Sequence, residues 1–259
     1  MKKKTRWPIY LIIGLMITFI AFTVPLPYYI EVPGTSEDIR KVLQVNNQSD
    51  QEEGSYQFVT VGVKHARMVD LVYAWLTPFT DIRSAKEMTG GSSDAEFMRI
   101  NQFYMETSQN MAKYQGLKAA GKEIELKYLG VYVLTVTDNS TFKGILNIAD
   151  TVTAVNDKTF ESSKEMVDYV NSQTLGDKVK VTYQEDGKVK TAEGKIITLE
   201  NGKNGIGIGL IDRTEVSSDV PIKFSTAGIG GPSAGMMFSL SIYTQIADPT
   251  LRNGRIIAG

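Results

Sequence analysis

The feature that most limits the possible folds is a long uncharged segment near the N-terminus. No charged side chain occurs from Trp7 to Ile30. About 20 helical residues are needed to cross the roughly 30 Å apolar layer of a bilayer, and residues 8–26 are close to that length. The segment therefore predicts a transmembrane helix, which we place at residues 7–30.

The charges beside this segment predict its orientation. The charges before it are all basic, namely Lys2, Lys3, Lys4 and Arg6. The first charge after it is Glu31. The positive-inside rule then places residues 1–6 in the cytoplasm and the body outside the cell, as a single-pass protein of the cell membrane. A cleaved signal peptide is the alternative, but Ala21-Phe22-Thr23 is a poor cleavage site.

The counts of cysteine and histidine narrow the possible chemistry. The chain has no cysteine, which excludes disulfides, thiolate nucleophiles and thiolate metal sites. Its one histidine is His65, so a His-rich zinc site cannot form and a Ser-His-Asp triad would have to use this residue. We interpret His65 as an ordinary surface or packing residue. A net charge of -1 gives no electrostatic reason to expect nucleic acid as a partner.

Residues 31–121 have the pattern of a mixed region of strands and helices. Apolar and polar residues alternate in Ser55–Lys64, which predicts a strand. We expect it to form a hairpin with a strand at Asp38–Val45. A capping box that begins at Ser93 predicts a long helix, which we end near Ala120.

Residues 122–200 form a strand-rich unit with a specific order of parts. A strand-like run is followed by a short helix at Ser163–Asn171 and by a hairpin whose turn contains Asp186-Gly187. The run from Gly144 to Asn156 fits the pattern G-x-L-x-x-x-D-x-V-x-x-V-N, with Ala149 where a glycine is usual. The unit resembles a PDZ domain in this pattern and in the order of its parts.

A second resemblance concerns the peptide-binding residues of this unit. The run Tyr128-Leu129-Gly130-Val131 resembles the carboxylate-binding loop of HtrA-type PDZ domains. The resemblance implies that its backbone N–H groups take a peptide carboxylate and that the following strand pairs with the peptide. The helix Ser163–Asn171 would then form a wall of the groove. The alternative is that these residues only close a small sandwich.

The glycine-rich run Gly230-Gly231-Pro232-Ser233-Ala234-Gly235 predicts a turn that delivers Ser233 to the start of a helix. Proline suits the first helical position, and free N–H groups at a helix start can stabilise an oxyanion beside a nucleophile. We take Gly230, Gly231 and Ala234 as this backbone support. From the residues alone, two alternatives remain open. Ser233 could be only an N-cap, or the glycines could hold a phosphate, although the G-x-x-x-x-G-K-[ST] pattern is absent.

The run Gly231–Gly235 resembles the P-S-A-G nucleophile motif of Lon-type serine peptidases, which use a Ser–Lys dyad. The order of anchor, helical region, PDZ unit and this motif is similar to the membrane-anchored PDZ–Lon-type serine peptidases of Gram-positive bacteria, the SepM/YlbL type. The resemblance implies part of a Lon-like domain at residues 201–259 with Ser233 as nucleophile. It also implies an exported peptide or protein substrate, such as a secreted signal peptide, a homo-oligomer of the full-length form, and no cofactor or metal.

The chain departs from this family at the general base. In the family, the dyad lysine lies beyond the segment that corresponds to Gly254–Gly259, whereas the last lysine of this chain is Lys223. We therefore expect the sequence to be truncated before the dyad lysine. A serine hydroxyl is a weak nucleophile without a base, so we expect the 259-residue form to be inactive.

Together these patterns predict an α+β protein with a transmembrane helix, a PDZ domain and a partial Lon-type proteolytic domain. The predicted function is that of an ATP-independent, extracytoplasmic serine endopeptidase whose PDZ domain helps to bind the substrate. The alternative is a non-catalytic, membrane-anchored PDZ protein that binds peptides, and a third possibility is a structural scaffold.

Overall fold

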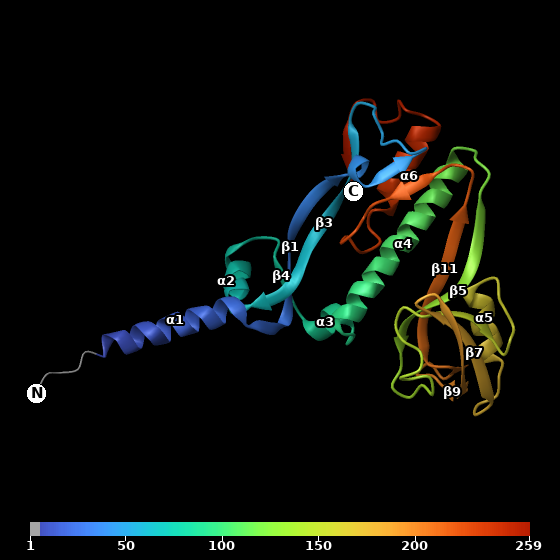
Figure 1. The fold of residues 1–259 in the computed structure, drawn as a ribbon, viewed down its shortest axis with the longest axis horizontal. Helices are drawn as coiled ribbons and strands as arrows, with labels where there is room; N and C mark the ends of the chain where they lie inside the picture. Colours follow the sequence, from blue (N-terminus) through green and yellow to red (C-terminus); the bar gives the residue numbers. More distant parts are fainter. Residues whose placement is uncertain (1–5) are drawn as a thin grey trace, which may run out of the picture. The chain divides into compact units, whose positions relative to one another are not determined.

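The computed structural model describes residues 6–259, so the prediction for residues 1–5 lies outside the described residues. The chain divides into two compact units (Figure 1). The first contains the residues up to Glu37 together with Val59–Asp94, and the second contains Asp38–Phe58 and Ala95–Gly259. Each unit is therefore built from two separate stretches of the chain.

The first unit combines helices and strands around few buried side chains. In it, β1 pairs with β4 in antiparallel fashion, with Tyr28 opposite Ser84. The buried apolar side chains of this unit are those of Tyr29, Ile30 and Ala66. Its elements are α1 (Trp7–Thr23), β1 (Pro25–Asp38), β3 (Ser55–Arg67), α2 (Met68–Leu76), β4 (Asp81–Ser84) and α3 (Ala85–Thr89), of which β1 and β3 extend into the second unit.

Helix α1 overturns the predicted transmembrane helix at residues 7–30. It contains 17 residues and is about 26 Å long at about 1.5 Å per residue. Val24 is extended, as expected for a residue before proline, and Pro25 opens strand β1. Among residues 6–259, no helix is both long and apolar enough to cross a membrane. The predicted fold class with a transmembrane helix, and the predicted single-pass localisation, are therefore wrong.

The second unit contains an antiparallel sheet of five strands in the order β11-β5-β6-β7-β8. The turn between β7 and β8 is Asp186-Gly187, and both residues have a positive φ, which is the geometry of a tight hairpin turn. The predicted hairpin is therefore observed. The elements of this part are β5 (Glu125–Val136), β6 (Thr151–Val155), α5 (Ser163–Asn171), β7 (Lys178–Glu185), β8 (Lys188–Lys195), β9 (Ile197–Thr198), β10 (Asn204–Gly205) and β11 (Ile208–Ser217).

One cluster of buried side chains lies between this sheet and helix α5. The apolar face of α5 contributes Met166 and Val170, and the strands and connecting loops contribute the rest. We call this cluster the sheet core. Its members are Val131, Val133, Phe142, Leu146, Val152, Val155, Phe160, Met166, Val170, Val179, Val181, Tyr183, Ile196 and Ile206.

A second cluster, the helix core, lies between two helices and several short strands. Phe238 is fully buried in it, with its ring centroid 5.7 Å from that of Phe58 and 5.0 Å from that of Phe224. The elements around it are η1 (Ile39–Lys41), β2 (Leu43–Val45), the start of β3, α4 (Asp94–Ala119), β12 (Ile222–Phe224), α6 (Gly235–Ile246) and β13 (Ile256–Ala258). The members of the helix core are Ile39, Leu43, Val45, Tyr56, Phe58, Met105, Ala112, Leu117, Ala234, Met237, Phe238 and Ile242.

The strand partners in this part differ from the predicted hairpin. Strand β2 pairs with β12, with Gln44 opposite Lys223. The first residues of β3 pair in parallel with β13, with Tyr56 opposite Ile257. The strands at the start of this region are therefore held by segments from the end of the chain and do not pair with each other.

Candidate functional site

Strand β11 is an edge strand, because β5 is its one partner in the described sheet. Helix α5 lies beside β11 and the preceding strand β10. The N–H of Ser163 in the first turn of α5 donates to Asp212 Oδ1 at 2.9 Å. After the C-terminal end of α5, the carbonyl of Gln173 accepts from Nδ2 of Asn204, which lies in β10, at 2.8 Å. We call the unpaired side of Ile208–Ser217 the β11 edge.

The β11 edge begins at the glycine-containing loop Gly205-Ile206-Gly207. Gly207 has φ +74°, and a Cβ there would lie 2.5 Å from Thr137 Oγ1. Both facts require glycine. The carbonyl of Ile206 accepts from Ser140 Oγ at 2.6 Å, and that of Gly207 accepts from the N–H of Thr137 at 2.9 Å.

These contacts orient the amide groups of the loop. In a trans peptide the N–H points opposite to the preceding carbonyl, so the N–H of Gly207 points away from Ser140. Among the described residues, the N–H groups of Ile206 and Gly207 have no acceptor. The carbonyl of Gly207 accepts a hydrogen bond from Thr137, and the next pair in the register is Ile208 opposite Val136. In an antiparallel ladder, hydrogen-bonded and non-hydrogen-bonded pairs alternate. The N–H and C=O of Ile208 therefore point away from β5. The loop and the start of β11 can therefore offer successive N–H groups to an anion.

The predicted carboxylate-binding run Tyr128-Leu129-Gly130-Val131 occupies a different position. It lies inside β5, where Val131 is opposite Asp212 of β11 on one side and Val152 of β6 on the other. A peptide therefore has no free strand edge to join at Val131. Gly130 has φ +131°, and a Cβ there would lie 2.2 Å from the carbonyl oxygen of Val152, so this glycine serves close approach of two strands.

Tyr128 is held in the same interior position. Its hydroxyl is buried and has no hydrogen-bond partner among the described residues. Burial raises the pKa of Tyr128 above its ordinary value, and the charges of Asp212 and Glu165 act in the same direction. The phenol is therefore neutral at physiological pH and acts as a packing group on the sheet core.

The predicted nucleophile Ser233 is exposed, in the turn before α6. The N-cap position is occupied by Ala234, and no side chain caps the helix. No hydrogen bond joins Ser233 Oγ to a base in the part of the chain that the structure describes. The sequence therefore predicted the turn and the helix start correctly, and the structure places no general base in contact with the serine.

Helix α4 holds the glycine-rich turn in place. The N–H of Gly231 donates to the carbonyl of Asn101 at 2.8 Å, and Ser108 Oγ donates to the carbonyl of Pro232 at 2.9 Å. A Cβ on Gly230 would lie 2.8 Å from Asn101 Cβ. Of the predicted oxyanion groups, the N–H of Gly231 is therefore already bonded. Ala234 is buried.

His65, interpreted as an ordinary residue, has specific partners in the first unit. Its Nε2 lies 2.6 Å from Asp94 Oδ2, and its ring centroid lies 4.3 Å from that of Tyr29. The Tyr29 hydroxyl also donates to Asp94. The hydrogen bonds from Tyr29 and His65 lower the pKa of Asp94. No group of three potential metal ligands comes together among residues 6–259.

Sequence reasoning missed the loop Gly205-Ile206-Gly207. The available signal was the alternation of glycine and isoleucine directly before a strand, but that alternation alone does not say whether the strand is an edge. The pairing of β11 with β5 supplies this information.

Comparisons with known proteins find a PDZ domain in this part of the chain. The PDZ domain family matches residues 102–196. The PDZ domain of an SdrC-like protein from Listeria monocytogenes is 35% identical over 34% of this chain and 93% of that chain, with a TM-score of 0.32. The corresponding domain from Listeria innocua is 38% identical over 31% of this chain and 92% of that chain, with a TM-score of 0.30. No curated protein matches the chain. The chain therefore contains a PDZ domain at residues 102–196, a domain type that binds peptides or proteins.

Proposed function

We propose that this protein binds the C-terminal segment of a peptide or protein along the β11 edge. The observation that carries the proposal is the edge strand itself, which starts at a loop with outward N–H groups and is flanked by α5. The terminal carboxylate would accept hydrogen bonds from Gly207 and Ile208. The peptide backbone would continue antiparallel to β11, which is the known mode of strand addition.

The side chains beside the loop favour an apolar terminal residue. Ile208 and Leu210 are partly buried and pack against the sheet core. A terminal apolar side chain placed beside them would bury surface that is now partly exposed. The charged groups of this edge, Asp212 and the first turn of α5, lie further from the carboxylate loop and would contact residues upstream in the peptide.

Two ligands test the proposal directly. A fluorescent peptide with an apolar C-terminal residue and a free carboxylate is compared with its C-terminal amide. We expect the amide to bind at least about tenfold more weakly, because hydrogen bonds to a charged group contribute about 1.5–3 kcal/mol. Amide chemical shifts should change in Gly207–Ile211 and in α5. Equal binding of the two peptides, or shifts confined to other strands, would contradict the proposal.

Two glycine variants serve as a matched pair. Gly207→Ala introduces a Cβ 2.5 Å from Thr137 Oγ1, whereas Gly202→Ala has a similar φ of +76° and nothing within 4 Å. Only the first should weaken binding of the carboxylate peptide. If the amide spectrum of Gly207→Ala shows that this variant is unfolded, the proposal is still tested by comparing the carboxylate peptide with its C-terminal amide on the protein without substitutions.

A second proposal concerns Ser233 as the nucleophile of a Lon-type serine endopeptidase, as its motif implies. The support is that an exposed serine stands on a turn held by Asn101 and Ser108 at the start of α6. The PDZ domain would then bind the substrate. Acyl transfer by a serine also requires N–H groups that stabilise the oxyanion, and a general base.

A fluorophosphonate probe separates the two proposals. Labelling at Ser233, lost in Ser233→Ala and retained in the neighbouring Ser239→Ala, would support the peptidase. Peptide binding without labelling would support the binding function alone. Sedimentation of the same sample tests the homo-oligomer that the family resemblance implies.

A further inference from the structure

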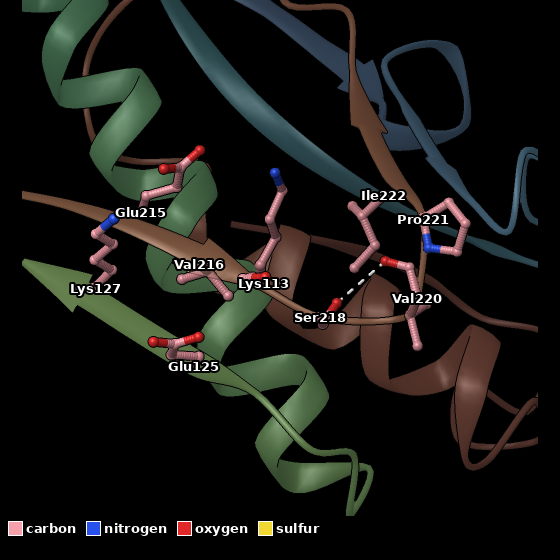
Figure 2. Close-up of a pocket in the computed structure, with 10 residues that line it drawn as sticks. Lys113, Glu125, Lys127, Glu215, Val216, Ser218, Val220, Pro221 and Ile222 are labelled. Carbon is pink, nitrogen blue, oxygen red and sulfur yellow. Dashed lines mark hydrogen bonds between the residues drawn. The ribbon is translucent and has the colours of Figure 1, made fainter.

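A cavity lies between α4, the start of β5, the end of β11 and the segment that leads into β12 (Figure 2). Its volume is about 580 Å³, within the range of roughly 300–1,000 Å³ that is typical of small-molecule sites. Half-buried apolar side chains line one wall, namely Val216, Val220 and Ile222. Val220 and Ile222 also pack against the helix core, so this wall is fixed.

The charged side chain with the least compensation in this cavity is Lys113. It is half-buried on α4, and its Nζ lies 5.7 Å from the ring centroid of Phe224. In the described part of the chain it forms no ion pair or hydrogen bond. Burial lowers the pKa of Lys113, and the charge of Glu215 offsets this only in part. A partly desolvated ammonium without an ion-pair partner gains from an added anion.

The other charges of the cavity are two carboxylates and a second lysine. Lys127 and Glu215 stand directly opposite each other in the β5–β11 register, where opposite charges attract each other across the strands. Glu125 stands opposite Ser217 and has no ion-pair partner among residues 6–259. The least compensated charges of the cavity are therefore Lys113 among the cations and Glu125 among the anions.

The hydroxyl of Ser218 does not compete for a ligand. It donates to the carbonyl of Val220 at 3.2 Å (Figure 2). This bond closes the turn before β12 and leaves the apolar wall and the two charges as the features that select a ligand.

We infer that this cavity binds a short zwitterionic peptide with apolar side chains. The peptide carboxylate pairs with Lys113, its terminal ammonium pairs with Glu125, and its side chains pack against Val216, Val220 and Ile222. The cavity volume suits a dipeptide or tripeptide. This site is separate from the β11 edge, and it requires both free ends of the ligand.

Three ligands test which ends are required: leucyl-leucine, its N-acetyl form and its C-terminal amide. Titration calorimetry on the whole chain should show the two blocked forms binding at least about tenfold more weakly than the free dipeptide. A loss of this size corresponds to about 1.4 kcal/mol. Equal affinity for all three, or no binding of the free dipeptide, would overturn the inference.

Variants assign each end to its partner. Lys113→Met should remove the difference between leucyl-leucine and its amide, and Glu125→Gln should remove the difference between leucyl-leucine and its N-acetyl form. In each case the loss of binding free energy caused by the substitution and the loss caused by blocking the ligand end should not add up, because both changes remove the same contact. Full additivity would show that the assigned residue does not contact that end.

A control variant is available on the same helix. Lys118 is exposed, and its Nζ lies 5.3 Å from the ring of Tyr114, so it reproduces the cation–aromatic contact outside the cavity. Lys118→Met should leave dipeptide affinity unchanged. If Lys113→Met fails to fold, Lys113→Arg keeps the charge and should retain the preference for a free carboxylate. Gly207→Ala should retain dipeptide binding, which separates this site from the β11 edge.

Discussion

The sheet core and the helix core differ in how far along the chain their members lie. All members of the sheet core fall between Val131 and Ile206. The helix core draws on three distant stretches, residues 39–58, 105–117 and 234–242. Closing a long loop costs conformational entropy before any contact forms. A continuous segment can therefore form the first core alone, whereas the second requires segments from both ends of the chain.

Polar contacts follow the same division. In the helix core, the Tyr56 hydroxyl lies 2.9 Å from Thr244 Oγ1 in a buried setting, and the fully buried Arg252 pairs with Asp50. In the sheet region, the polar contacts join residues closer in sequence: Ser140 Oγ donates to the carbonyl of Ile206 in a buried setting, and the N–H of Asn147 donates to Asp150. In the helix core, polar contacts as well as apolar packing therefore hold together segments that are distant in sequence.

The largest test of this comparison truncates one phenylalanine in each core. Phe238 and Phe142 are both fully buried, and each change to alanine should cost about 3–5 kcal/mol. We expect Phe238→Ala to open the helix core while the amides of the sheet remain protected, and Phe142→Ala to open the sheet core. Residue-level hydrogen exchange measures both. Simultaneous loss of protection in both cores would show that they form one cooperative unit.

A second test removes the buried charge pair of the helix core. Arg252→Met leaves Asp50 buried without its partner, and we expect a loss of about 3 kcal/mol in the free energy of unfolding, measured in urea. The double variant Arg252→Met with Asp50→Leu should recover part of this loss, because no buried charge remains unpaired. An equal loss in the single and the double variant would mean that the charge pair is not the cause.

A smaller effect is expected for a glycine of the sheet. In Gly130→Ala, the alanine would have to adopt φ +131°, and its Cβ would lie 2.2 Å from the carbonyl oxygen of Val152. Backbone strain of this kind lowers the free energy of unfolding by about 1–3 kcal/mol. Gly144→Ala has φ +76° but nothing within 4 Å, so it measures the conformational cost alone. The thermal unfolding midpoint should fall more for the first variant. Equal falls would exclude crowding between β5 and β6 as the reason for Gly130.

The smallest expected effect concerns the pH dependence of the sheet core. Burial raises the pKa of Asp150, while the hydrogen bond from the N–H of Asn147 acts against this rise. The folded state therefore favours the protonated acid, and this stabilisation is present at acid pH and is lost as the pH rises through the carboxyl range. Asp150→Asn removes the buried charge and should gain stability relative to the unchanged chain between acid and neutral pH. A constant difference across this range would contradict it.

The local parts of the fold could be predicted from sequence. The order of strands and helix in the PDZ domain follows from short-range patterns such as Gly144–Asn156 and Asp186-Gly187, and the comparison with the PDZ family confirms the domain. The position of Ser233 before a helix was also predictable, because glycine and proline act within a few residues of their own position.

The strand partners could not be predicted. Period-two alternation identifies a strand but carries no information on its neighbours, so β2 was paired with the wrong segment. For the same reason Tyr128–Val131 was taken as a peptide-binding edge, although β11 and β6 occupy both sides of Val131. The extent of α1 was overestimated because an uncharged run was read as one helix, although Val24 and Pro25 end it.

From the sequence by itself followed one histidine, no cysteine, a serine in a glycine-rich turn before a helix, and a PDZ domain in the middle of the chain. Only the tertiary structure decided that β11 is the sheet edge, that α4 holds the serine turn, and that Lys113 and Glu125 line one cavity. The physical reason is that side-chain periodicity and turn chemistry act over a few residues. Hydrogen bonding between strands and burial of a charge depend instead on segments that meet only when the chain is folded.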